Sequence, residues 1–243
     1  MTIIIPMAGL SSRFLKAGYT LPKYMLYIRN RSLFNIAVSS FEYYFKSCKF
    51  VFVARDLFDT PKFIDCECKL MGVENYEIVT LSEPTKGQAE TVYLGIQNAN
   101  VPNDEPILIF NIDTFRPGYR FPKEIKNWDG YLEVFVGSGA NWSYAKTESE
   151  DSTRVIETAE KKEISQYCST GLYYFKSAKM FVDAYRDNNG ATPNGINELY
   201  VAPLYNKIVS SSDIHIHVIE RGDVIFSGVP DEYEFLLHRE FSE

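Results

Sequence analysis

Short apolar runs alternate with helical apolar periodicities over the first 111 residues of the chain. The runs are rich in β-branched and aromatic residues, as expected of strands that are covered on both faces. The segments predicted as strands are 3–5, 50–54, 76–81 and 106–111, and those predicted as helices are 31–46, 61–71 and 87–99. Strands that alternate with helices predict βαβ units and a mainly parallel sheet.

The pattern changes after Asp113, because predicted strands then follow one another with little helix between them. These strands are 131–136, 142–146, 154–158 and 170–175. Later segments are predicted as helices at 177–186, 198–209 and 231–238, a strand at 214–219, and turns at Asn189-Gly190 and Asn194-Gly195. The chain has no repeat, low-complexity tract or linker. We therefore predict a single α/β domain over residues 1–243, in which 129–243 form a mixed or antiparallel extension of the sheet built by 1–128.

Composition places the chain among globular proteins and excludes some partners. It has 243 residues, 45% of them hydrophobic and 15% aromatic, and a formal net charge of −7. The negative charge argues against a nucleic-acid or anionic-membrane partner. No segment predicts a membrane span or a signal peptide, and the four cysteines fit free thiols, so we expect a cytoplasmic protein. The aromatic surplus fits either a large core or the interface of a homodimer.

The residues after the first strand suit the binding of a triphosphate. Positions 8–12 are mostly small, so backbone N–H groups can approach a ligand closely, and a helix that begins near Ser12 would point its positive end to the same place. Arg13 and Lys23 add two cations nearby. An ordinary strand–turn–helix connection explains the loop equally well, so the rest of the chain must decide between the two interpretations.

Two further loops follow strands whose carboxyl ends are predicted at the same sheet edge, where open α/β sheets bind ligands. Asp113 follows the strand 107–110 and could hold Mg²⁺ bridged to phosphate oxygens, or cap the next turn. Gly87 allows a close backbone approach, and Gln88 offers a donor and an acceptor to a nucleobase, although it could simply lie in the first turn of a helix. Their place beside the first loop favours the ligand-binding interpretation.

The second half offers weaker candidates. Lys161 could reach an acceptor phosphate, although its Glu-Lys-Lys run is typical of a solvated surface. His215 and His217 have a spacing that could hold zinc, but a third ligand is not evident, and the exposed side of a strand explains them more simply. The chain has no Ser-His-Asp order, no P-loop and no G-x-G-x-x-G motif.

Taken together and in order, the motifs resemble those of the nucleotidyltransferases that make NDP-sugars and related activated metabolites. The motifs that carry this resemblance are Pro6-Met-Ala-Gly-Leu-Ser-Ser-Arg13-Phe14, Pro22-Lys23, Asn111-Ile-Asp113, Trp142-Ser-Tyr-Ala-Lys146, Ala159-Glu-Lys-Lys162, Ser169-Thr-Gly-Leu-Tyr-Tyr-Phe175 and Asn197-Glu198-Leu-Tyr200. They cover nearly the whole chain. Within the family, the chain most resembles capsule-biosynthesis members, including the CTP:phosphoglutamine cytidylyltransferases.

The resemblance implies a Rossmann-like sheet and a reaction in which an acceptor phosphate attacks the α-phosphorus of an NTP and pyrophosphate leaves. Residues 1–128 would bind the nucleotide and residues 129–243 the acceptor. By motif, Ala8, Gly9, Leu10 and Ser12 would cradle the nucleotide, Arg13 would lie on its β- and γ-phosphates, and Gln88 with Gly87 would read the base. Lys23 would neutralise the α-phosphate and the acceptor, Asp113 would hold Mg²⁺, and Glu160, Lys161, Gly171 and Glu198 would face the acceptor. Such chemistry needs positioning and charge neutralisation rather than a protein nucleophile.

One departure from the family pattern concerns the metal. Many relatives have a second metal-binding aspartate in a segment like Asp-x-Gly-Thr-Pro near the C-terminus, whereas this chain has Phe226-Ser-Gly-Val-Pro230. Either Asp113 holds the metal with phosphates and water, or a neighbour such as Asp223 or Glu198 helps.

The sequence thus predicts a Mg²⁺-dependent nucleotidyltransferase that moves CMP from CTP to a small phosphorylated acceptor, first of all L-glutamine phosphate, for capsule or surface-polysaccharide biosynthesis. A sugar-1-phosphate nucleotidyltransferase is the first alternative. A glycosyltransferase of related fold is a second, against which Arg13 and Lys23 argue, because a diphosphate donor needs less cationic cover. An inactive nucleotide-binding regulator is a third, left open by the absent second aspartate.

Overall fold

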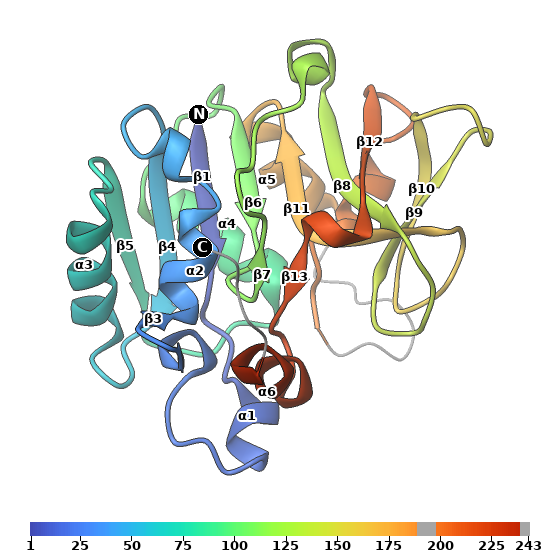
Figure 1. Ribbon diagram of the computed structural model, residues 1–243. Coiled ribbons are helices and arrows are strands. Elements are labelled where there is room, and N and C mark those ends of the chain that lie inside the picture. Colours follow the sequence, from blue (N-terminus) through green and yellow to red (C-terminus); the bar gives the residue numbers. More distant parts are fainter. Residues whose placement is uncertain (189–197, 239–243) are drawn as a thin grey trace.

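A nine-stranded mixed sheet forms the centre of the described part of this computed structural model, residues 1–188 and 198–238 (Figure 1). Its strands are β1 (Thr2–Pro6), β4 (Lys49–Arg55), β5 (Tyr76–Leu81), β6 (Ile107–Phe110), β8 (Gly130–Val136), β9 (Ser143–Thr147), β10 (Val155–Glu160), β11 (Tyr167–Phe175) and β12 (Ile214–Ile219). Strands β6, β1, β4 and β5 lie side by side in parallel, which confirms the parallel sheet predicted for the first half. The apolar runs of β1 and β6 are fully buried, as helices on both faces require.

Strand β11 joins the second half of the chain to this parallel sheet. It pairs antiparallel with β6 on one side and with β8 and β9 on the other, while β10 extends β9 and β12 runs parallel to β8. The register between β11 and β8 shifts between Ser169 and Tyr173, around Gly171, whose φ is +88°. This arrangement confirms the predicted mixed extension.

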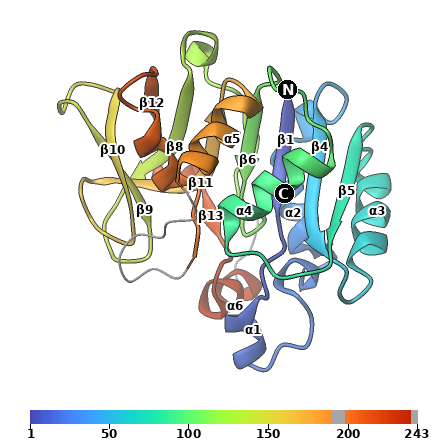
Figure 2. The ribbon, with the colours of Figure 1, turned by 180° about the vertical axis from the view of Figure 1, so that it is seen from behind.

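Within the described residues, two helices cover each face of the sheet. Helices α2 (Leu33–Ser39) and α3 (Thr60–Met71) pack on one face, and α4 (Gln88–Asn98) and α5 (Ala178–Asp187) pack on the other, which Figure 2 shows from behind. Ser32 and Ser177 cap α2 and α5, since their side-chain oxygens accept the backbone N–H groups of Asn35 (3.0 Å) and Met180 (3.2 Å).

The aromatic surplus lies largely in the two cores between sheet and helices. Phe34, Phe41, Phe50, Phe52 and Phe110 are fully buried and contact one another on the α2 face. The core therefore accounts for much of the aromatic content, and the homodimer stays a prediction.

The C-terminal segment returns to the carboxyl ends of β1 and β6. There α6 (Pro230–His238) lies beside α1 (Ser12–Lys16), below the sheet in Figure 1, and the ring of Tyr233 contacts Phe14 edge-on at 6.1 Å. A small antiparallel pair, β7 (Thr114–Phe115) and β13 (Ile225–Phe226), holds this return in place. Residues near positions 13, 113 and 230 thus meet at one edge.

Two predicted helices are wrong in part. Residues 31–46 contain the end of a short hairpin of β2 (Tyr27–Ile28) and β3 (Arg31–Ser32), then α2, then a separate 3₁₀ turn at Glu42–Tyr44. Helix α2 ends at Ser39, and the hydroxyl of Ser40 accepts the backbone N–H of Arg116 at 2.9 Å. The apolar residues after this break still face the core, so their spacing does not reveal it.

The second correction concerns residues 198–209, where the structure has only a 3₁₀ helix at Ala202–Lys207. Leu199 is instead extended against the start of α4, since its N–H donates to Lys86 O (2.9 Å) and its carbonyl accepts Ala89 N–H (2.8 Å). The predicted turns at Asn189-Gly190 and Asn194-Gly195 lie outside the described residues, as does Asn197 of the last motif.

The remaining 3₁₀ helices are Lys23–Met25, Lys123–Asn127 and Arg221–Asp223. Within residues 1–188 and 198–238, no helix has the length and apolar character needed to cross a membrane.

Candidate active site

A cavity of about 570 Å³ opens at the carboxyl ends of β1 and β6, within the size range of small-molecule sites. Both halves of the chain line it. The first half contributes the segments 6–13, 84–88 and 111–114, and the second half contributes residues on β9, β10 and β11 and near positions 198–200 and 226–232. The three loops that the sequence predicts at one sheet edge therefore do meet there.

The first loop lines the cavity with all of its predicted nucleotide-binding residues. These residues are Ala8, Gly9, Leu10, Ser12 and Arg13. Ser11 adopts a left-handed conformation with φ of +51°, and its hydroxyl accepts the backbone N–H of Lys23 at 3.2 Å. This bond ties the small-residue loop to the basic loop, and Arg13 and Lys23 both line the cavity.

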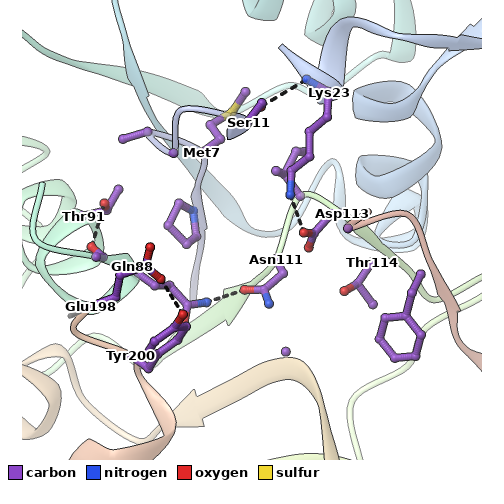
Figure 3. Close-up of a pocket in the computed structure, with 18 of the residues that line it drawn as sticks. Met7, Ser11, Lys23, Gln88, Thr91, Asn111, Asp113, Thr114, Glu198 and Tyr200 are labelled. Carbon is purple, nitrogen blue, oxygen red and sulfur yellow. Dashed lines mark hydrogen bonds and ion pairs between the residues drawn. The ribbon is translucent and has the colours of Figure 1, made fainter. Parts of the chain in front are cut away.

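Lys23 and Asp113 form an ion pair although they are 90 residues apart (Figure 3). Both side chains are about one-quarter exposed or less, at 20% and 25%. The pair places a cation and a carboxylate at one point of the cavity wall, next to the first loop.

Glu232 is a second carboxylate near Asp113 that the sequence did not predict as a site residue. A Cβ atom on Gly228 would lie 3.1 Å from Asp113 Oδ2 and 3.7 Å from Glu232 Oε2, so this glycine leaves open the space that both carboxylates border. Glu232 Oε2 accepts the N–H groups of Gly228 (2.7 Å) and Val229 (3.2 Å). Glu232 lies in the first turn of α6, directly after Phe226-Ser-Gly-Val-Pro230, the segment that differs from the family pattern. This position in the sequence could have marked Glu232 as a candidate metal ligand.

This donor set fits a hard divalent cation such as Mg²⁺, which prefers carboxylate oxygens and retains water or phosphate ligands. The neighbours suggested from sequence are less well placed. Asp223 does not line the cavity, and its carbonyl accepts Arg116 Nη1 at 2.8 Å. Glu198 lines the cavity but is bonded to Tyr200, on the side opposite Lys23 and Asp113 in Figure 3.

Gln88 and Gly87 line the cavity, but both also have partners within the protein. The amide of Gln88 donates to Asn111 and its Oε1 accepts Val201 N–H at 3.4 Å. A Cβ on Gly87 would lie 2.5 Å from Leu199 N and 2.6 Å from Leu199 O. The absence of a side chain on Gly87 therefore lets the backbone of Leu199 come close, and this contact holds the segment 198–201 beside Gln88.

We expect Gly87→Ala to lower the free energy of unfolding by about 2–3 kcal/mol, because φ of +145° and the contact with Leu199 both disfavour a Cβ. Urea denaturation would measure the change. Gly18→Ala is the matched control: its φ is also positive, at +92°, but nothing lies within 4 Å of its Cβ position. Equal losses for the two variants would show that the Leu199 contact contributes nothing.

The predicted acceptor residues also line the cavity, with one exception. Glu160, Gly171 and Glu198 line it, whereas Lys161 does not. Lys161 Nζ instead donates to the hydroxyl of Tyr200 at 2.8 Å, and that hydroxyl donates to Glu198. Burial raises the pKa of Glu160, a residue only 7% exposed, and the nearby Lys161 opposes this rise.

Gly171 leaves space for the side chain of Asn111, which also lines the cavity. A Cβ at this position would lie 2.3 Å from Asn111 Nδ2, so the glycine gives the Asn111 side chain room beside the cavity. Asn111 in turn accepts the amide of Gln88. The two motifs are thus in contact, which their sequence separation does not reveal.

His215 and His217 are half-buried, so the prediction that they mark an exposed side is wrong. Trp128 stacks on His215 with ring centroids 4.9 Å apart, because the segment before β8 folds over this face. The Nδ1 atom of His215 hydrogen-bonds to Thr153 Oγ1 at 2.8 Å. Among the described residues, no group of three or more His, Cys, Asp or Glu side chains is arranged to hold a metal.

Comparisons with known proteins identify relatives by structure. No protein-family model matches the chain, and no curated protein matches it. A nucleoside-diphosphate-sugar pyrophosphorylase from Vibrio cholerae RC9 is 48% identical over 98% of this chain and 100% of its own, with a TM-score of 0.93. A UDP-glucose pyrophosphorylase in complex with UDP-glucose is 15% identical, covering 97% of this chain and 96% of its own, with a TM-score of 0.74. The inositol-1-phosphate CTP transferase from T. maritima is 12% identical, covering 97% and 91%, with a TM-score of 0.72. The last two likenesses concern the fold alone.

Proposed function

The chain belongs to the nucleoside-diphosphate-sugar pyrophosphorylase family of nucleotidyltransferases, and we propose that it transfers CMP from CTP to a small phosphorylated acceptor with release of pyrophosphate. L-Glutamine phosphate is the first candidate acceptor, and capsule or surface-polysaccharide biosynthesis in the cytoplasm is the proposed setting. In this proposal residues 1–128 bind the nucleotide and residues 129–243 bind the acceptor.

The observation that carries this proposal is the meeting of Lys23 and Asp113 beside the loop 8–13. A nucleotidyltransferase must hold two phosphate groups together while negative charge accumulates between them. Lys23 supplies positive charge there, and Arg13, which also lines the cavity, supplies more. Asp113, with Glu232 nearby, supplies oxygen donors for Mg²⁺.

The proposed reaction forms one bond and breaks one. An oxygen of the acceptor phosphate attacks the α-phosphorus, and the bond between that phosphorus and the oxygen bridging to the β-phosphate breaks, so that pyrophosphate leaves with the electron pair. Lys23 neutralises the two phosphates that approach each other, and Arg13 holds the departing phosphates. Mg²⁺, when bound at Asp113, supplies charge that offsets the phosphate oxygens.

The other residues position the two substrates. In the proposal, the nucleotide is cradled by Ala8, Gly9, Leu10 and Ser12, its base is read by Gln88 with Gly87, and the acceptor is faced by Glu160, Gly171 and Glu198, with Lys161 acting through Tyr200. The resemblance to capsule-biosynthesis cytidylyltransferases supports CTP. The same fold in the inositol-1-phosphate CTP transferase is compatible with that choice.

A sugar 1-phosphate is the second candidate acceptor. It is favoured by the name of the Vibrio cholerae relative, a nucleoside-diphosphate-sugar pyrophosphorylase. In that case the reaction at the α-phosphorus is the same and the product is an NDP-sugar.

The proposal is tested by pyrophosphate release in the presence of Mg²⁺, measured for each of the four NTPs with L-glutamine phosphate and with glucose 1-phosphate. We expect release with CTP and L-glutamine phosphate, and none without an acceptor. Release only with glucose 1-phosphate would assign the sugar alternative. Release of NDP from a nucleotide sugar would assign a glycosyltransferase, and nucleotide binding without any turnover would assign a regulator.

A further inference from the structure

The side-chain amide of Gln88 is held in one orientation by the backbone of Val201. A main-chain N–H group can only donate, so the atom of Gln88 that accepts it, at 3.4 Å, is the oxygen Oε1. Gln88 Nε2 then lies on the other side, where it donates to Asn111. This hydrogen bond requires that Asn111 turns Oδ1, rather than Nδ2, toward Gln88. One backbone group therefore sets the orientation of two side-chain amides in succession.

The amide nitrogen of Asn111 is turned toward Gly171 and the cavity. Asn111 lines the cavity, and a Cβ atom on Gly171 would overlap its Nδ2. Gly171 lies where the register between β11 and β8 shifts, and its φ of +88° suits a glycine, so the strand itself supplies this space. The main chain of Asn111 is also held, because its N–H donates to Gly171 O (3.3 Å) and its carbonyl accepts Thr114 N–H (3.2 Å). Asn111 thus presents an N–H donor at a fixed place in the cavity wall.

Asn111 lies between the residues that the proposed function assigns to the two ends of a nucleotide (Figure 3). On one side it contacts Gln88, the proposed reader of the base. On the other side lies Asp113, which is paired with Lys23 where the phosphates are proposed to bind. In a nucleoside triphosphate, the group between the base and the α-phosphate is the ribose. Its hydroxyl oxygens accept hydrogen bonds, so they are suitable partners for an oriented amide donor.

We propose that Asn111 recognises the ribose of the NTP by donating a hydrogen bond from Nδ2 to one of the ribose hydroxyl oxygens. Gln88 is a positioning residue for this contact, because its amide keeps Asn111 Oδ1 turned away from the sugar. An amide nitrogen has two hydrogens, so Gln88 can donate to Asn111 and to a base together. This inference rests on the proposed function, which supplies the places of base and phosphates. It does not depend on which base is read, because all four NTPs carry the same ribose.

Deoxynucleotides test the contact directly. With Mg²⁺ present, we expect calorimetry to show that CTP binds at least about fivefold more tightly than 2′-deoxy-CTP or 3′-deoxy-CTP, whichever lacks the hydroxyl that Asn111 contacts. Asn111→Leu, which keeps a side chain of similar size without a donor, should bind CTP and that analogue within about twofold of each other. Asn98→Leu is the matched control and should keep the preference, since Asn98 is exposed at the opposite end of α4 from Gln88.

Gln88→Leu tests the positioning role. Its affinity for CTP and for the deoxy analogue should fall together where the base contact is lost. In addition, the ratio of the two affinities should fall to about twofold or less, because Asn111 is then free to rotate. Both ligands carry the same base, so this ratio reports the ribose contact alone. An unchanged ratio would overturn the positioning role of Gln88.

Equal binding of CTP and both deoxy analogues by the parent protein would overturn the inference. So would an undiminished preference in Asn111→Leu, or in Asn111→Ala if the leucine variant unfolds at a lower urea concentration than the parent. If another NTP binds in place of CTP, the same comparison is made with that NTP and its deoxy analogues. Absence of binding by all four NTPs would refute the inference together with the proposed function. A ribose preference that depends on Asn111, without pyrophosphate release from any NTP and acceptor, would refute the proposed function alone.

Discussion

Alanine at position 23 is expected to lower kcat for pyrophosphate release by about 10²- to 10³-fold. Lys23 Nζ forms an ion pair with Asp113 at the cavity wall, where we propose that the acceptor phosphate and the α-phosphate approach each other. Its charge is needed most when negative charge accumulates in the transition state, so the loss falls on kcat. Nucleotide affinity should change by less than about tenfold, because the loop 8–12 and Arg13 remain. Single-turnover kinetics and equilibrium nucleotide binding measure the two effects separately.

Lys16→Ala is the control for this prediction, since Lys16 is an exposed lysine of α1 that does not line the cavity. It should leave kcat unchanged within about twofold. A similar loss in both variants would refute a specific role for Lys23. Loss of nucleotide binding in Lys23→Ala, together with an inactive parent protein, would favour the regulator.

The sheet could be predicted because its strands are buried on both faces. Continuous apolar runs such as Phe50-Val-Phe-Val-Ala54 have few alternatives to a central strand, and their alternation with helices fixes a parallel arrangement. The same reasoning places Asp113 and the loop that leads to Arg13 at one edge, because the segments that contain them come next after the parallel strands β6 and β1. The local sequence pattern was therefore enough to predict that the loops after β1 and β6 meet at the candidate site.

Contacts between distant segments could not be predicted. Helix α2 ends at Ser39, and the hydroxyl of the next residue, Ser40, accepts a hydrogen bond from the backbone N–H of Arg116, 76 residues away. The apolar spacing of the segment gives no sign of this contact. Gly87 lines the cavity, but the close contact that disfavours a Cβ there is with Leu199, which is distant in the sequence. Glu232 approaches Asp113 only because β13 pairs with β7, two short strands that carry no clear pattern.

Methionine in place of Arg116 is expected to lower the free energy of unfolding by about 3–5 kcal/mol. The Arg116 guanidinium donates to both carboxylate oxygens of Glu133, at 2.8 and 3.1 Å, and to the carbonyl of Asp223 at 2.8 Å. Glu133 is 0% exposed, so the variant would leave its charge buried, with a hydrogen bond from Thr170 (3.1 Å) but no cation. Urea denaturation measures the loss.

Arg154→Met provides the contrast, because Arg154 pairs with Asp213 at 3.3 Å on the surface and should cost about 1 kcal/mol or less. Adding Glu133→Gln to Arg116→Met should restore part of the stability, since it removes the buried charge. If Arg116→Met costs no more than Arg154→Met, the buried pair does not stabilise this fold.

The cost of Arg116→Met should also depend on pH. Burial lowers the pKa of His217, the cross-strand neighbour of Glu133; Arg116 lowers it further, while Glu133 raises it. In the parent protein this lowered pKa makes stability rise with pH up to about 6.5, the ordinary pKa of histidine. Without Arg116, His217 binds a proton more readily and offsets the charge of Glu133. The loss should therefore be smaller at about pH 5.5 than at about pH 8. Because Arg116 also donates to the carbonyl of Asp223, two residues before β13, the same variant should loosen Phe226, which lines the cavity. If residues 129–243 bind the acceptor as we propose, the KM for the acceptor should then rise more than the KM for the nucleotide.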